Sequence, residues 1–255
     1  MHIEIKASLQ LDELKQAVSL IPSISTNKTS FDVDFVERLL GRRQGKNLTR
    51  STSRRLKRIS SHILPSIKPR ITYEIFPIKS TDGGLVTLTN GLQFKSRKMS
   101  RSIQGASWLV CSIATISPEI DHRINALMEQ GKMADAYVAD TIGSGAIEHI
   151  ADGFHKGFEK KIIKSGPSVS LRFSPGYCDW PVTDQEKLFS LLDNESVGVE
   201  LGNTFLMSPR KSISAVFAVF DAFNAVIKNP HHNPCRSCWK KDCIARRVDA
   251  VTPSH

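Results

Sequence analysis

Two tight-turn signals lie close together in the first half of the chain, and they constrain its fold more than any other feature. Asp82-Gly83-Gly84 and Asn90-Gly91 supply residues that accept a positive φ, which short hairpin turns require. The flanking segments 71–78, 85–89 and 92–94 are short and look extended. The sequence therefore predicts an antiparallel meander in this region.

Helical and strand-like segments alternate along the remaining chain. Apolar residues with helical spacing occur in four segments, 9–22, 31–42, 120–128 and 184–192. A longer helix is expected over 134–161, interrupted or restarted around Gly143 and Gly145. Further strands are expected at 106–116, 168–173, 197–201, 205–207 and 212–220. This order predicts an α+β fold with helices packed on a mainly antiparallel, twisted sheet.

Length and composition indicate a globular protein. A chain of 255 residues with 40% hydrophobic residues can bury a sizeable core, as one large domain or two small ones. The longest apolar stretches, 106–116 and 214–219, are too short to cross a bilayer, and the first residues do not resemble a secretory leader. Five cysteines in a chain of this length do not resemble a disulfide scaffold. We therefore expect a cytoplasmic protein without a membrane partner.

The positive charge is concentrated in one segment. The net charge is +10, and residues 41–70 contain ten Lys or Arg and no acidic residue. Clustered cations can contact phosphates, but no aromatic residue lies among them and no nucleic-acid motif is recognisable. A solvated basic helix is the first interpretation of this segment, docking of an acidic protein the second, and nucleic-acid binding the third.

The segment 172–180, RFSPGYCDW, combines charged, aromatic and turn-forming residues. Alternation over 168–173 predicts a half-buried strand with Val169 and Phe173 on one face and Arg172 on the other, polar face. Pro175 and Gly176 then favour a type II turn, which we expect to leave main-chain groups unpaired. A guanidinium, a ring and free main-chain groups could together bind a carboxylate, a flat heterocycle and an amine. An ordinary hairpin corner is the alternative.

Two acidic residues, Glu148 and Asp152, lie four residues apart in the predicted long helix. They share one side of that helix, at the edge of its apolar stripe. Exposure to solvent is the ordinary explanation for such a pair, and contact with a ligand is the alternative.

Four motifs follow one another along the chain: TIGSGAIE at 141–148, RFSPGY at 172–177, DWP at 179–181 and MSPRKSIS at 207–214. Together, and in this order, they resemble the activation domain of cobalamin-dependent methionine synthase, in its free-standing form. The resemblance covers about residues 70–250 and implies that family's antiparallel fold. It divides the chain into a helical lead-in with the basic segment at 1–69, an S-adenosylmethionine-binding domain at 70–228, and a cysteine-rich segment at 229–255.

The resemblance also implies roles for individual residues. Arg172 corresponds to the arginine that holds the ligand carboxylate, Ser174 to a residue offering main-chain contacts, and Tyr177 to the aromatic residue beside the adenosyl portion. Pro175 and Gly176 complete the same binding motif. Glu148 corresponds to a carboxylate near the sulfonium, where a negative charge would stabilise the cationic sulfur.

One position departs from the family pattern. Gly166 lies six residues before Arg172, where the methionine synthase domain has another glutamate. The contact to the ligand amine must therefore come from elsewhere, or the pocket differs.

The activity implied is reductive reactivation of a corrinoid, in which S-adenosylmethionine supplies the methyl group and a donor supplies one electron. The sequence contains no Asp-x-His-x-x-Gly cobalamin motif. The cobalamin is therefore expected on a partner, either a separate corrinoid methyltransferase or a truncated methionine synthase. A flavodoxin-like or ferredoxin-like protein is the expected electron donor. A non-catalytic docking or sensor module for a corrinoid protein is the alternative.

The C-terminal segment contains Cys235, Cys238 and Cys243 in a C-x-x-C-x-x-x-x-C arrangement. Thiolates at this spacing can bind one metal, with a fourth zinc ligand from His231, His232 or Cys178. A [4Fe–4S] cluster, unliganded thiols and a redox disulfide are the other interpretations. A metal site here and the basic segment at 41–70 could together form a metal-dependent nucleic-acid binder. This is the last of the functional alternatives. Cys111 lies in an apolar run and is expected in the core.

Overall fold

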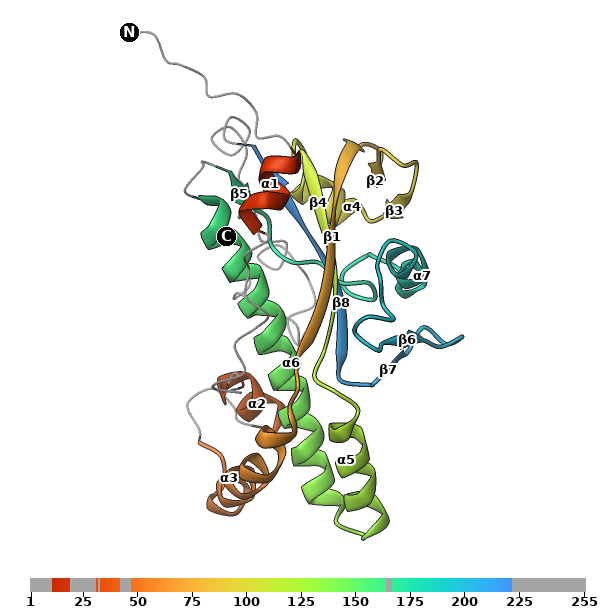
Figure 1. The fold of residues 1–255 in the computed structure, drawn as a ribbon. Helices are drawn as coiled ribbons and strands as arrows, with labels where there is room; N and C mark the ends of the chain where they lie inside the picture. The colour runs from red at the N-terminus through yellow and green to blue at the C-terminus, as the bar shows by residue number, and fades with distance from the viewer. Residues whose placement is uncertain (1–10, 19–30, 32, 42–46, 164–166, 222–255) are drawn as a thin grey trace, which may run out of the picture.

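A six-stranded antiparallel sheet forms the centre of the molecule (Figure 1). The computed structural model describes residues 11–18, 31, 33–41, 47–163 and 167–221. The strand order is β3-β2-β1-β4-β8-β5, and all neighbouring strands run antiparallel. Helices pack on this sheet, so the predicted α+β class is confirmed.

The predicted meander forms one side of the sheet. It consists of β1 (Arg70–Ser80), β2 (Leu85–Leu88) and β3 (Gln93–Lys95). The turns between them contain Gly83, Gly84 and Gly91 at φ values of +64°, +81° and +89°. These positive values explain why both turn signals consist of glycine and residues that tolerate the left-handed region.

The centre of the sheet is formed by β4 (Trp108–Thr115) and β8 (Ser212–Phe220), which pair over their full length. All eight residues of β4 are buried, because both faces of the sheet are covered. Leu109 and Cys111 belong to one hydrophobic cluster, whereas Val110 belongs to another on the opposite face. The long apolar run in the sequence therefore reflects a strand between two layers.

One face of the sheet is covered by α6 (Met133–Ile162), which lies diagonally across it (Figure 1). The predicted interruption at Gly143 and Gly145 is wrong, because this helix is continuous. The two glycines instead allow close packing: a Cβ on Gly145 would lie 2.3 Å from Val36 Cγ2, and one on Gly143 would lie 3.1 Å from Lys211 Cγ.

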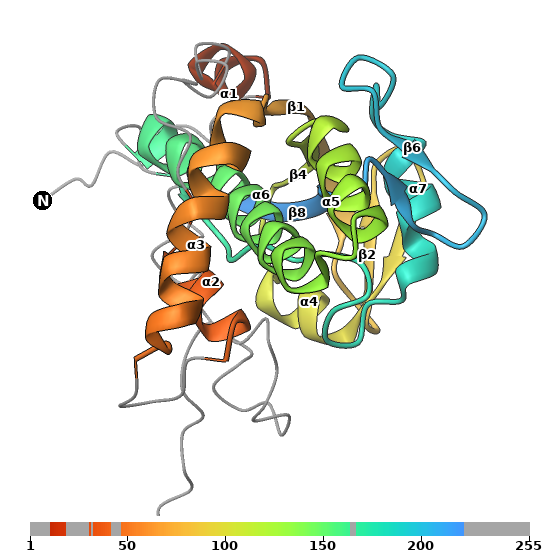
Figure 2. The ribbon, with the colours of Figure 1, turned by 90° about the horizontal axis from the view of Figure 1, so that it is seen from below.

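Three N-terminal helices and α5 (Glu119–Glu129) pack against α6 (Figure 2). The N-terminal helices are α1 (Leu11–Val18), α2 (Val33–Leu39) and α3 (Arg50–Ile63). Helices were predicted in each of these regions, and α3 falls in the basic segment. The expected domain boundaries at residues 69 and 228 stay a prediction.

The opposite face of the sheet is covered by α4 (Arg97–Ser102), η4 (Val182–Asp184) and α7 (Gln185–Phe189). Met99 of α4 and Leu188 and Phe189 of α7 join the cluster that contains Leu109 and Cys111. A separate two-stranded sheet, β6 (Glu200–Leu201) and β7 (Met207–Ser208), lies beside them (Figure 1). Another 3₁₀ turn, η2 (Leu64–Ser66), links α3 to the sheet. In the part of the chain that the structure describes, no helix combines the length and apolarity needed to cross a membrane.

Candidate functional site

The segment 168–173 is a short strand followed by a bulge. Only β5 (Ser168–Val169) pairs regularly with β8, and an isolated bridge then joins Phe173 to Val216. Val169 pairs with Val219, and Phe173 pairs with Val216. The chain therefore advances four residues along this segment for three residues along β8. One extra residue is therefore accommodated, which is the definition of a β-bulge.

The bulge corrects the predicted alternation. Val169 packs in the cluster beneath α6, whereas Phe173 packs in the cluster on the other face of the sheet. Ser170 explains the irregularity, because its hydroxyl accepts a 2.9 Å hydrogen bond from the backbone N–H of Ala218. Arg172 consequently reaches α6 rather than an open polar face.

Arg172 is buried against two carboxylates of α6. Its side chain is 3% exposed, and its Nη2 lies 2.5 Å from Glu148 Oε2 and 3.0 Å from Asp152 Oδ1. The two acidic side chains are 30% and 47% exposed. The site therefore places a buried cation below two negative groups that reach solvent.

The guanidinium has hydrogen-bonding capacity left over. Within the described residues, Arg172 Nε and Nη1 are buried and have no hydrogen-bond partner. Buried unpaired donors are rare in folded proteins, since each carries a desolvation cost. An anionic group bound at these two nitrogens would satisfy them, and a carboxylate has the matching planar geometry.

The predicted turn follows directly. Tyr177 N–H donates to Ser174 O at 3.2 Å, and Gly176 has φ +86°, as a type II turn requires. The expectation of bare main-chain groups holds only in part, because Gly176 N–H donates to Trp180 O and Trp180 N–H donates to Tyr177 O. The ring of Tyr177 is 45% exposed at the outer edge of this turn.

Two aspartates attach the turn to the neighbouring elements. Asp179 accepts a 2.6 Å hydrogen bond from the hydroxyl of Ser96, which caps α4, and another from the backbone N–H of Lys98. The buried Asp184 accepts from Trp180 Nε1 at 2.9 Å and from Lys95 N–H at 3.1 Å. The turn is therefore held in position from both β3 and α4.

The fold is similar to that of a solved structure, the MetH reactivation domain bound to AdoHcy. The match has a TM-score of 0.52 and 16% sequence identity, and it covers 83% of this chain and 77% of that chain. The chain has the fold of the MetH reactivation domain. No protein-family model matches the sequence, and no curated protein matches it.

The reactivation-domain fold brings most of the predicted site residues together. Glu148 and Arg172 are in direct contact, and Ser174, Pro175, Gly176 and Tyr177 form the adjoining turn. We name this group, together with Asp152, the Arg172 site. Its ligand-binding role stays a prediction.

Asp152 joins the Arg172 site although the sequence motifs did not select it. Its spacing of four residues from Glu148, one helical turn, was the available signal. Gly166, the departure from the family pattern, lies outside the described residues.

The metal prediction falls on the C-terminal segment. Cys235, Cys238 and Cys243 lie outside the described residues, and among those that are described no group of three potential ligands could hold a metal ion. Cys111 is fully buried as expected, and burial, followed by the charge of Glu74, raises the pKa of its thiol well above the usual range. Cys178 is exposed beside the turn.

The basic helix α3 buries Leu56, Ile59 and Ile63 and turns its charged side chains outward. Arg55 and Arg58 both pair with Asp135 of α6, at 2.9 and 2.7 Å. The hydrogen bond from Arg58, together with both positive charges, lowers the pKa of Asp135. Part of the basic segment is therefore structural, and its partner stays a prediction.

Proposed function

We propose that this protein binds S-adenosylmethionine at the Arg172 site and uses it to methylate a corrinoid carried by a partner protein. The observation that carries the proposal is the buried guanidinium with two unsatisfied nitrogens, placed between two carboxylates and a Pro-Gly turn. The solved domain with the same fold is bound to AdoHcy, the demethylated product of that methyl donor.

Each part of the ligand has a chemically suitable partner. The free Nε and Nη1 of Arg172 would take the ligand carboxylate. The backbone N–H of Ser174 has no hydrogen-bond partner within the described residues and would donate a hydrogen bond to the ligand. The half-exposed ring of Tyr177 offers an aromatic surface to the adenine.

The two carboxylates suit the positive charges of S-adenosylmethionine. Its sulfur is a sulfonium and its amino group is an ammonium, so both are stabilised by nearby anions. Glu148 would stabilise the sulfonium. Asp152 replaces the amine contact that the family places at the position of Gly166.

The reaction needs positioning more than acid or base groups. A reductant supplies one electron to cob(II)alamin, and the resulting Co(I) nucleophile forms a cobalt–carbon bond while the carbon–sulfur bond breaks. S-adenosylhomocysteine leaves with the electron pair of that bond. The protein holds the methyl carbon in line with the partner's cobalt, and no proton is transferred in the reaction.

Turnover tests the proposal directly. The protein is incubated anaerobically with a corrinoid methyltransferase loaded with cob(II)alamin, S-adenosylmethionine and titanium(III) citrate, and methylcobalamin is followed by its visible spectrum. The proposal predicts methylcobalamin in the presence of the protein and none when the methyl donor is omitted. Binding of the methyl donor without turnover, for any corrinoid protein tried, would support the docking or sensor alternative instead.

The electron donor is proposed to be flavodoxin-like or ferredoxin-like, because such proteins are acidic and this chain has a net charge of +10. The C-terminal cysteines would bind zinc or a [4Fe–4S] cluster that relays the electron. A visible spectrum of anaerobically purified protein distinguishes zinc from a cluster. Only the cluster has thiolate-to-iron absorption bands, which are broad and centred at about 400 nm.

A further inference from the structure

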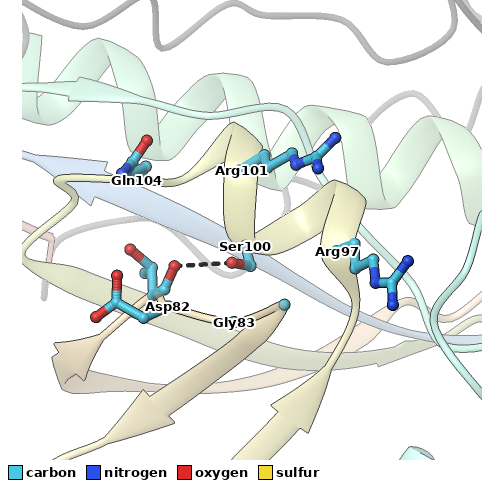
Figure 3. Close-up of a pocket in the computed structure, with 8 residues that line it drawn as sticks. Asp82, Gly83, Arg97, Ser100, Arg101 and Gln104 are labelled. Atoms are coloured by element: carbon cyan, nitrogen blue, oxygen red, sulfur yellow. Dashed lines mark hydrogen bonds between the residues drawn. The ribbon is translucent and has the colours of Figure 1, made fainter.

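A second pocket lies away from the Arg172 site, between the β1–β2 turn and α4 (Figure 3). Its volume is about 490 Å³, which is enough for a small metabolite. The lining residues are Thr81, Asp82, Gly83, Gly84, Arg97, Ser100, Arg101 and Gln104. None of them belongs to the Arg172 site.

Two guanidiniums dominate the charge of this pocket. Arg97 and Arg101 are one helical turn apart on α4, so their side chains lie on the same side of the helix. Both are exposed, and neither has a carboxylate partner within the described residues. Arginine pairs without acidic partners are suited to a doubly charged anion, which each planar guanidinium can bind through two N–H groups.

The β1–β2 turn is shaped around one of these arginines. Gly84 has φ +81°, and a Cβ on it would lie 2.7 Å from Arg97 Cγ. Glycine at this position therefore lets the stem of Arg97 lie directly across the turn. Ser100 fixes the other side, because its buried hydroxyl donates a 2.8 Å hydrogen bond to Thr81 O.

The other end of the pocket carries a hydrogen-bond acceptor, the carboxylate of Asp82. Figure 3 shows Asp82 and Gln104 toward one end and the guanidiniums of Arg97 and Arg101 toward the other. Asp82 is exposed, and its carboxylate has no hydrogen-bond or ion-pair partner within the described residues, whereas its backbone carbonyl accepts from Leu85 N–H. A carboxylate there would repel a second anion but would accept hydrogen bonds from hydroxyl or amine groups.

We propose that this pocket binds a phosphate monoester that also carries hydroxyl groups, with the phosphate on Arg97 and Arg101 and a hydroxyl on Asp82. Two guanidiniums match the charge of a phosphate monoester, close to −2 at neutral pH, better than they match a single carboxylate. Sugar phosphates and nucleotides both satisfy this chemistry.

Isothermal titration of the full chain with ribose 5-phosphate tests the proposal. We expect saturable binding that ribose, which lacks the phosphate, does not reproduce. The double variant Arg97→Gln/Arg101→Gln should weaken binding about tenfold or more, while the remote variant Arg54→Gln/Lys57→Gln, with the same change of net charge, should bind as the natural protein does. Equal binding by both double variants would overturn the proposal.

Two further arms define the ligand. Asp82→Asn should weaken the binding of ribose 5-phosphate but leave the binding of inorganic phosphate unchanged or slightly tighter, since only the sugar hydroxyls contact that carboxylate. If inorganic phosphate binds as tightly as ribose 5-phosphate to the natural protein, the assignment of Asp82 is wrong. Titration with AMP distinguishes a nucleotide ligand from a sugar phosphate. Tighter binding of AMP than of ribose 5-phosphate indicates a nucleotide, and weaker binding indicates a sugar phosphate. If titration with millimolar ribose 5-phosphate releases or absorbs no heat of binding, the proposal is overturned, whatever the result of ligand binding at the Arg172 site.

Discussion

The indole Nε1 of Trp180 donates a 2.9 Å hydrogen bond to Asp184 Oδ2, and both residues are buried. The same oxygen also accepts from the backbone N–H of Lys95, while Asp184 Oδ1 pairs with Lys187 at 2.7 Å. A single carboxylate thus connects the turn of the Arg172 site to β3 and α7. Its removal would leave the buried indole N–H of Trp180 and the partly buried N–H of Lys95 without acceptors.

Asp184→Ala should therefore lower the free energy of unfolding by about 2–4 kcal/mol, measured by urea denaturation. Lys187→Ala is the matched control, because it removes only the partner that is 45% exposed and should cost less than about 1 kcal/mol. Similar losses in both variants would show that the ion pair, not the buried hydrogen bonds, connects the elements.

Two glycines of α6 should respond oppositely to alanine. Gly145→Ala places a methyl group 2.3 Å from Val36 Cγ2 and should destabilise the protein by about 1–3 kcal/mol despite the better helix propensity of alanine. Gly153 has nothing within 4 Å of an added Cβ, so Gly153→Ala should stabilise by about 0.4–1 kcal/mol. The double variant Val36→Ala/Gly145→Ala should recover part of the loss, and failure to do so would contradict the contact.

Asp135 should make stability depend on acidic pH. Its pKa in the folded protein is lowered, first by the hydrogen bond from Arg58, below the ordinary value of 3.8. The stabilising contribution is then complete above the unfolded pKa and is lost as the pH falls through the folded one. Asp135→Asn should cost about 1 kcal/mol at pH 7, and the difference from the natural protein should shrink below about pH 4. A difference that is constant with pH would contradict the ion pair.

Glu148 should distinguish the cationic methyl donor from its neutral product. Glu148→Gln should weaken S-adenosylmethionine about three- to tenfold and S-adenosylhomocysteine much less, because only the former carries a sulfonium. Isothermal titration with both ligands measures the ratio. An unchanged ratio would place Glu148 away from the sulfur, and the same pair of titrations on Asp152→Asn would then identify which carboxylate faces it.

Much of the fold could be predicted because its signals are local. The turns at Gly83, Gly84 and Gly91 and the alternating strands between them depend on neighbouring residues alone, and all were found. The break expected in α6 was wrong because Gly143 and Gly145 serve contacts with Lys211 and Val36, which are remote in sequence. Helix α4 was missed, although Ser96 caps it by accepting from Met99 N–H.

The sequence motifs selected residues that lie together, but they did not predict the orientation of Arg172. The motif selected Arg172 and Glu148, and the structure brings them into contact. The side of the sheet that Arg172 reaches depends on a bulge stabilised by Ser170 and Ala218, which are 48 residues apart in the sequence. Local alternation could not reveal that pairing, nor the second contact of Arg172 with Asp152.

The unpaired nitrogens of Arg172 are proposed to bind the amino-acid carboxylate of the ligand. Isothermal titration of the natural protein and of Arg172→Lys with two ligands tests it: S-adenosylhomocysteine and methylthioadenosine, which keeps the nucleoside and sulfur but lacks that carboxylate. We predict that Arg172→Lys weakens S-adenosylhomocysteine about 10- to 100-fold and changes methylthioadenosine less than about threefold. Equal losses for both ligands, or binding of S-adenosylhomocysteine that the substitution leaves unchanged, would contradict the account.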